Sequence, residues 1–214
     1  MIFTDIHTHH SLSEPDILPV RNIRMEEAES VLATAQGGFF SVGIHPWYLH
    51  NISAEDIRLL ELICSDKRVV LIGECGIDKN STFSAEMQIP VFEKQILISE
   101  RISKPLIVHC VGSFNELFVL RKKHQPTQRW IIHGFRGKPQ LAEQILQSGC
   151  DISFGEKFNP ESVRIVPFER LFIETDQSEF SIEEIYHQIA AAKNCKIHEL
   201  SAGKVFINEF ASIL

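Results

Sequence analysis

The sequence contains few cysteines, and their spacing follows no pattern. The five cysteines are widely scattered over 214 residues, and no CxxC pair occurs. Their number is odd, and several lie in apolar runs, where a cysteine behaves as a small hydrophobic side chain. We therefore expect reduced thiols in a cytoplasmic protein rather than a disulfide framework.

Long hydrophobic runs and an excess of positive charge are also missing. The longest apolar runs, such as PLIVHC and RWIIHGF, are too short to span a bilayer, and the N-terminus shows no secretory signal. The net charge of −7 argues against a protein that holds nucleic acid mainly through a basic surface. It is compatible with an enzyme that handles phosphates through bound metal ions. We expect no membrane association, and no obligate protein partner is evident.

Short runs of β-branched and aromatic residues alternate along the chain with longer amphipathic stretches. Most of the short runs are almost continuously apolar, which is typical of parallel strands buried on both faces. We expect strands at residues 2–7, 17–23, 39–43, 69–73, 105–109, 129–133, 151–154 and 171–174. Helical patterns cover residues 25–36, 53–64, 85–102, 114–124, 138–149, 181–194 and 205–214.

This alternation predicts an α/β fold, a compact (β/α)8 TIM-like barrel that forms one domain over residues 1–214. The length is near the lower limit for that fold, about 200 residues. The link THHSLSEPD between the first two strands is shorter than the usual crossover of about a dozen residues. We therefore expect the first helix to be missing. An open seven-stranded α/β layer is the structural alternative.

Histidines and carboxylates gather at the ends of the predicted strands, where an α/β barrel builds its active site. The residues at these positions are Asp5, His7, His9, His45, Glu74, Asp78, His109, His133, Glu174 and Asp176. Buried charges there would be poorly solvated without a cation to pair with them. Imidazole and carboxylate groups suit zinc, and also manganese, iron or nickel. The strand ends therefore predict a metal centre.

The stretch DIHTHH near the N-terminus follows the alternation of a strand. Side chains in a strand point to opposite faces in turn, so His7 and His9 share a direction and His10 does not. Asp5 lies on the same side as His7, one step deeper, where it could accept a hydrogen bond from a ligand histidine. We expect His7 and His9 to bind metal and His10 to be a loop histidine.

A series of motifs runs along nearly the whole chain in a fixed order. These are DIHTH (5–9), GIHP (43–46), GECGID (73–78), HCV (109–111), HGFRG (133–137) and ETD (174–176). The series resembles the TatD family of metal-dependent deoxyribonucleases, a branch of the amidohydrolase-like barrels. Gln88, Phe92 and Gln95 also resemble the family's pattern after the fourth strand.

The resemblance implies a hydrolase with two divalent metal ions. His7, His9 and Asp176 would hold one ion, and His109 and His133 would hold the second. Glu74 would bridge the two ions. Zinc is the ion that we expect, with magnesium, manganese, iron or nickel as alternatives.

The same resemblance implies how the site would work. Two ions about 4 Å apart can clamp a phosphodiester and activate a water molecule between them. Asp176 would accept the proton of that water, next to the bridging Glu74. His45 would contact the substrate phosphate. The expected substrate, bound transiently, is DNA or another phosphodiester.

Several positions depart from the family's pattern. Cys110 and Val111 replace the arginine that usually follows the histidine of the fifth strand, so a bidentate phosphate contact is lost. Arg136 stands where the family has a small residue, either as a substitute or, in the favoured interpretation, as a surface arginine. KNSTFS (79–84) replaces the aromatic residues that often follow the fourth-strand motif in the family. QSEFS (177–181) replaces the usual A-P-Y after ETD. Because the ligands survive, we expect metal-dependent hydrolysis with an altered substrate.

Three other interpretations remain open at this point. The opening DIHTHHSLSE is also similar to that of PHP-type phosphoesterases, although GECGID favours the TatD family. A related barrel enzyme could act on an amide or lactone, but those enzymes often bridge their metals with a modified lysine, where this chain has Glu74. The third is a degenerate member that binds metal without catalysis. Each predicted ligand position is retained, which argues against it.

Overall fold

A computed structural model describes residues 2–11 and 14–211 of the chain. The chain forms two compact units. The first comprises Met1–Arg21 and Ile131–Leu214, and the second comprises Asn22–Trp130. We describe each unit by itself.

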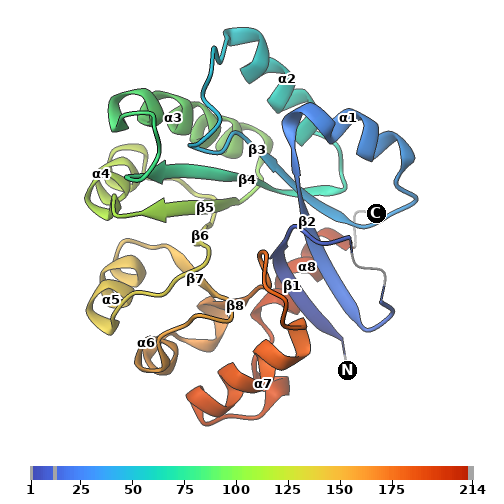
Figure 1. Cartoon of the computed structure of the whole chain (residues 1–214), viewed down its shortest axis with the longest axis vertical. Helices are drawn as coiled ribbons and strands as arrows, with labels where there is room; N and C mark the ends of the chain where they lie inside the picture. Colours follow the sequence, from blue (N-terminus) through green and yellow to red (C-terminus); the bar gives the residue numbers. More distant parts are fainter. Residues whose placement is uncertain (1, 12–13, 212–214) are drawn as a thin grey trace. The chain divides into compact units, whose positions relative to one another are not determined.

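Eight parallel strands follow one another in sequence order within one sheet (Figure 1). They are β1 (Phe3–Thr8), β2 (Ile17–Arg24), β3 (Phe39–Gly43), β4 (Val69–Asp78), β5 (Leu106–Val111), β6 (Trp130–Ile132), β7 (Asp151–Phe154) and β8 (Leu171–Ile173). The first unit contains β1, β7 and β8, and the second contains β3, β4 and β5. The strands β2 and β6 each begin in one unit and end in the other.

From β2 onward one helix separates each pair of successive strands, and two more helices follow β8. They are α1 (Met25–Thr34), α2 (Ala54–Cys64), α3 (Ala85–Ile102), α4 (Phe114–His124), α5 (Pro139–Gln147), α6 (Pro160–Ile165), α7 (Ile182–Lys193) and α8 (Ala202–Ala211), with short 3-10 turns at Phe168–Arg170 and Ile197–Glu199. In the described part of the link from β1 to β2 the chain forms no helix. An isolated parallel bridge between Thr8 and Asp176 joins the end of β1 to the segment after β8. This is the topology of a (β/α)8 barrel without its first helix, as predicted, and the open seven-stranded alternative is wrong.

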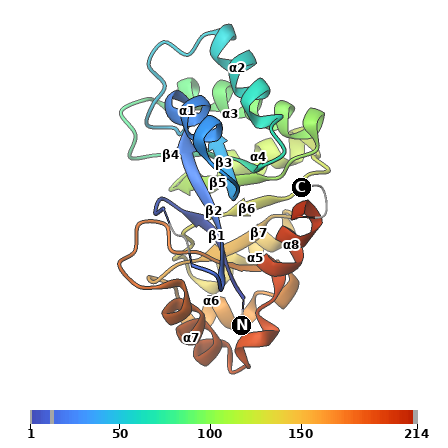
Figure 2. The ribbon, with the colours of Figure 1, turned by 90° about the vertical axis from the view of Figure 1, so that its right-hand side faces the viewer.

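In the first unit, α7 and α8 (orange to red in Figure 2) pack against β1 and β8. The hydroxyl of Tyr186 on α7 donates a hydrogen bond of 3.1 Å to the carbonyl oxygen of Thr4, and its ring lies 5.1 Å from that of Phe3. Gly203 on α8 lies so close to Thr4 that a Cβ there would come within 3.0 Å of the Thr4 Cβ. These contacts hold β1, which carries the predicted ligand His7 and leads directly into His9.

In the second unit, two buried glutamines of α3 hold the ends of β3 and β4. The side chain of Gln95 accepts a hydrogen bond from Ile44 N (2.8 Å) and donates one to Ile44 O (3.0 Å). Gln88 does the same with Asp78, at 2.7 and 2.9 Å. Each glutamine satisfies both polar groups of one buried backbone residue, which would otherwise cost free energy. The helix α3 thereby fixes the backbone next to His45 and at the end of GECGID.

The strand β4 extends beyond its predicted end at residue 73 and continues to Asp78. Gly76 pairs with His109 in β5 and has a φ of +138°, and a Cβ there would lie 2.0 Å from the His109 carbonyl oxygen. Glycine is the residue that permits this approach and conformation. The glycines of the motif mark a close backbone contact inside the strand rather than its end.

Candidate metal centre

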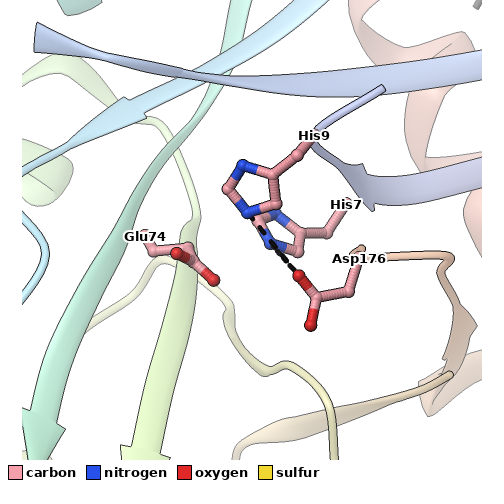
Figure 3. A group of neighbouring side chains, drawn as sticks. All are labelled: His7, His9, Glu74 and Asp176. Atoms are coloured by element: carbon pink, nitrogen blue, oxygen red, sulfur yellow. Dashed lines mark ion pairs between the residues drawn. The ribbon is translucent and has the colours of Figure 1, made fainter. Parts of the chain in front are cut away.

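His7 of β1, His9 directly after that strand and Asp176 after β8 form a cluster in the first unit. Asp176 N donates to His7 O at 2.9 Å and His9 N donates to Asp176 O at 3.1 Å, so the backbone sets the register of all three residues. The Nε2 atoms of His7 and His9 lie 3.8 and 3.5 Å from Asp176 Oδ1. Figure 3 shows both imidazoles directed at this carboxylate. Strand alternation correctly predicted that His7 and His9 share a direction.

The His10 side chain does not join those of His7 and His9. Its Nε2 lies 3.2 Å from the carbonyl oxygen of Ser178, within hydrogen-bonding distance. Its backbone N–H donates to Thr8 Oγ1 at 3.2 Å. The ring contacts a loop, as the alternation indicated.

His133 and Glu174 extend the cluster of the first unit. The ring centroids of His7 and His133 lie 4.7 Å apart, and His133 Nδ1 lies 3.3 Å from Glu174 Oε1. Ligand atoms of His133, Glu174 and Asp176 all lie within 4.8 Å of one another. Glu174 is completely buried. Burial acts to raise its pKa, but the hydrogen bond and charge of His133 and the charge of His7 hold that pKa below its usual value.

Sequence reasoning placed Glu174 at a strand end but left it out of the ligand set. Gly134 N also donates to Glu174 Oε1, at 2.7 Å, so the carboxylate is held by the residue that follows His133. The motifs HGF and ETD are about forty residues apart, and only the fold brings these two side chains together. The first unit therefore offers two carboxylates, Glu174 and Asp176, where one was predicted.

Asp5 supports the segment that carries Asp176. Its Oδ1 accepts a hydrogen bond from Thr175 N (3.0 Å), and its Oδ2 accepts one from Thr175 Oγ1 (2.6 Å). Burial raises the pKa of Asp5 to about 7, against the opposing effect of the bonds from Thr175. The contacts of Asp5 thus lead to the residue before Asp176, and its predicted bond to a ligand histidine stays a prediction.

A second cluster lies in the second unit, at the ends of β3 and β5 and within β4. Ligand atoms of His45, Glu74 and His109 lie within 4.8 Å of one another. His45 Nε2 is 3.7 Å from Glu74 Oε2, and the His45 and His109 ring centroids are 4.5 Å apart. Three residues predicted from separate motifs therefore meet within one unit.

The hydrogen bonds of His45 indicate which of its nitrogens carries a proton. Its Nδ1 accepts a bond of 3.1 Å from Trp47 N, so in the neutral ring the proton resides on Nε2. A histidine that binds metal uses the lone pair of one nitrogen and carries its proton on the other. This arrangement suits His45 to donate through Nε2, as its expected contact with a phosphate requires.

Asp78 connects the second cluster to an aromatic residue. Its Oδ2 lies 2.8 Å from His109 Nε2 and accepts a bond of 2.7 Å from Trp47 Nε1. Asp78 is almost fully buried, at 1% exposure. Burial acts to raise its pKa, but the bonds from His109, the Asn80 backbone and Trp47 lower that pKa overall. Sequence reasoning gave Asp78 no role, although its spacing from Glu74 places both on one side of β4.

A hollow of about 290 Å³ opens beside Asp176 in the first unit. Gly134, Glu174 and Thr175 line it with Asp176, and Arg136 and Lys157 contribute positive charge. Both basic residues are exposed. The arginine interpreted as a surface residue is therefore exposed and also borders the candidate site.

The donor chemistry of both clusters fits divalent metal ions. Each offers imidazole nitrogens and carboxylate oxygens from buried or half-buried side chains. This mixture suits zinc and several other divalent ions. A divalent cation would also compensate the close approach of Glu174 and Asp176, which otherwise repel each other.

The family model described as TatD related DNase matches residues 7–202. The chain belongs to this family. The predicted resemblance is confirmed, and the PHP-type interpretation of the opening is set aside because the match extends over all the later motifs.

Among the described residues, none of the helices combines the length and apolarity needed to cross a bilayer.

Curated relatives in this family carry the names of nucleases and hydrolases. A 3'-5' ssDNA/RNA exonuclease TatD of Erwinia amylovora is 31% identical over 147 residues, covering 64% of this chain and 56% of the relative. A deoxyribonuclease Tat-D of Schizosaccharomyces pombe is 29% identical, covering 72% and 56%. An uncharacterized metal-dependent hydrolase, YabD of Bacillus subtilis, is 27% identical, covering 64% and 58%. The chain thus spans little more than half the length of these relatives.

Two solved structures share the fold over nearly the whole chain. YJJV, a TatD homologue from Escherichia coli, has a TM-score of 0.77 at 19% identity, covering 96% of this chain and 95% of that one. A hydrolase TatD family protein from Entamoeba histolytica has a TM-score of 0.76 at 18% identity, covering 97% and 96%. These structures confirm the barrel fold.

Proposed function

We propose that the chain is a metal-dependent hydrolase that cleaves phosphodiester bonds in nucleic acid, with DNA as the first candidate substrate. The observation that carries this proposal is the gathering of histidines and carboxylates into a cluster in each unit. Relatives named as a 3'-5' ssDNA/RNA exonuclease, a deoxyribonuclease and a metal-dependent hydrolase support it. From the sequence we further propose the cytoplasm as its compartment and no obligate protein partner.

The proposal includes two divalent ions, with zinc first and magnesium, manganese, iron or nickel as alternatives. His7, His9 and Asp176 would hold one ion, and His109 and His133 the other, with Glu74 as the bridge; the family resemblance supports this assignment. Bound divalent ions neutralise phosphate charge and lower the pKa of water to about 7. The position of Glu174 beside His133 supports a further donor, or a hydrogen-bond acceptor that orients this histidine.

Asp176 is suited to accept the proton of the attacking water. Backbone bonds to His7 and from His9 fix its position, and 30% of its side chain is exposed, so it can pass a proton to solvent. A proton acceptor held in this way contributes about 10²- to 10⁴-fold to a rate. In the second unit, His45 would donate from Nε2 to a phosphate oxygen, and Asp78 would hold His109 in place.

Metal analysis together with a phosphodiesterase assay on single-stranded DNA tests the proposal. We expect bound divalent metal, hydrolysis that chelator abolishes, and loss of that hydrolysis in Glu74→Gln and Asp176→Asn. Glu143→Gln is the matched control, because it removes an exposed carboxylate of α5 that belongs to neither cluster. Less than one metal per chain and no chelator-sensitive hydrolysis would contradict the proposal.

Two further results would point elsewhere. Turnover of a cyclic amide without turnover of any phosphodiester would favour the amidohydrolase interpretation. Nuclease activity that is unchanged in Glu74→Gln and Asp176→Asn would come from a contaminant and favour a member that binds metal without catalysis.

A further inference from the structure

Two adjacent aromatic residues are exposed beside the second cluster. Trp47 is 50% exposed and Tyr48 is 53% exposed, and both lie in the turn that follows β3. The Trp47 ring lies 5.3 Å from the His45 ring and 6.2 Å from the His109 ring, measured between centroids. The Tyr48 ring lies 5.7 Å from that of His45. Half of each large aromatic side chain thus remains in water next to the histidine proposed to contact phosphate.

The turn holds these rings in a defined position. The indole N–H of Trp47 donates to the buried carboxylate of Asp78 at 2.7 Å. The backbone N–H of Tyr48 donates to His45 O at 3.0 Å. Ser81 Oγ donates to Pro46 O at 2.8 Å, so the segment KNSTFS braces the turn. Ordering an aromatic before it meets a ligand reduces the entropy lost on binding.

We propose that Trp47 and Tyr48 form a stacking surface for a nucleobase of the single-stranded substrate, one whose adjoining phosphate lies at His45. The inference rests on the function proposed above and adds how the substrate is held. Aromatic stacking accepts any base and is suited to single strands, whose bases are not paired. It takes the place of the aromatic segment that KNSTFS replaces in this sequence.

The charge of the chain favours stacking, rather than general charge attraction, as the means of holding a single strand. A net charge of −7 gives little of the general attraction on which many nucleic-acid binders depend. Affinity for a single strand must then come from local contacts, and base stacking contributes about 1–3 kcal/mol per base. That range corresponds to about 5- to 150-fold in affinity, at about 1.4 kcal/mol per tenfold.

The chain provides its own spectroscopic probe for this contact. It has two tryptophans, and Trp130 is completely buried whereas Trp47 is half exposed. Added oligothymidylate should quench the emission of Trp47 in the presence of chelator, where no hydrolysis occurs. An abasic oligonucleotide of the same length carries the same phosphates without bases and should cause little quenching. Trp130→Phe should keep the quenching.

Variants measure the contribution of each ring to affinity. Trp47→Ala and Tyr48→Ala should each weaken binding of labelled oligothymidylate, measured by anisotropy with chelator, about 5-fold or more. Trp47→Phe keeps an aromatic ring without the N–H donor and should lose less than Trp47→Ala. Phe168→Ala, which removes a 37% exposed aromatic on the other unit, is the matched control and should bind as the wild type does.

The outcomes separate this inference from the proposed function. Equal quenching by both oligonucleotides, or unchanged affinity in both alanine variants, would overturn the stacking surface while chelator-sensitive hydrolysis by the wild type still stands. Base-dependent quenching without any hydrolysis would support the stacking surface and contradict the hydrolase. The wild-type quenching needs no variant, so a variant that fails to fold leaves the test intact.

Discussion

The two clusters of histidines and carboxylates are held in place by different means. In the first unit, the backbone of β1 pairs with Asp176, and the carboxylates Asp5 and Glu174 are completely buried. In the second unit, bonds of side chains predominate: Asp78 contacts His109 and Trp47, and the His45 ring accepts from the backbone N–H of Trp47. The first arrangement is suited to fixing ligands, and the second couples a predicted ligand to residues for which we propose a substrate contact.

This difference has a mechanical consequence. A backbone pairing moves only when the strand moves, whereas a bond between two side chains is lost when either residue changes. A substitution in the first unit should therefore affect metal binding and stability together. A substitution in the second unit should separate metal binding from substrate binding.

The largest expected effect is the loss of a ligand histidine from either unit. His7→Gln in the first unit and His109→Gln in the second should each remove bound metal and lower kcat by about 10²- to 10⁴-fold. Metal content by mass spectrometry and kcat on single-stranded DNA are the measurements. If one of the two variants kept full metal content and activity, its unit would not contribute to a two-metal site.

Removal of a supporting residue should have a smaller effect that differs between the units. Thr175→Val deletes the hydroxyl that donates to the buried Asp5, so we expect about 10- to 100-fold weaker metal binding and a loss of about 1–3 kcal/mol in the free energy of unfolding. Asp78→Asn should weaken metal binding by a similar factor and also raise KM, because Trp47 loses its charged acceptor. Equal KM in both variants would erase the proposed distinction.

Arg136 tests whether the first unit also contributes to substrate binding. Because its exposed charge borders the hollow beside Asp176, Arg136→Gln should raise KM about 2- to 5-fold with little change in kcat. The slope of log affinity against log salt should fall by about 0.7, the value for one contact to a single strand. An unchanged slope would restore the interpretation of Arg136 as a surface residue only.

The smallest effect is expected for a charge outside both clusters. Arg58 forms an exposed ion pair with Glu55 on α2, and such pairs contribute about 0–1 kcal/mol. Arg58→Gln changes the net charge by the same amount as Arg136→Gln and should leave KM and the salt slope unchanged. A shift in KM equal to that of Arg136→Gln would mean that total charge, rather than position, determines substrate binding.

Local patterns in the sequence were enough to predict several elements. Residues 85–102 form α3 with the predicted bounds, and the helical pattern over residues 53–64 forms α2 over Ala54–Cys64. The direction of His7 and His9 followed from the alternation of one strand. These features depend only on residues that are close in the sequence, so a short stretch of sequence is enough to predict them.

Contacts between distant segments could not be predicted in the same way. Glu174 meets His133, and Trp47 meets Asp78, only because the fold places their strand ends together. The helix α6 is six residues long, too short to show a helical period, and was missed. The strand β4 was predicted to end at residue 73, whereas it continues to Asp78 through Gly76, which permits the close approach of β5. The single-domain prediction and the residue-by-residue metal assignment stay predictions.

The two glutamines of α3 also determine which loops of this protein can tolerate substitutions. Gln95 anchors Ile44 and Gln88 anchors Asp78, so the turn over residues 46–52 and the segment over residues 79–84 each start from an immobilised backbone. Loops that start from such fixed points can be replaced without moving the histidines and carboxylates of the clusters. Randomised libraries confined to these two stretches would be a direct way to change which ligands the chain binds.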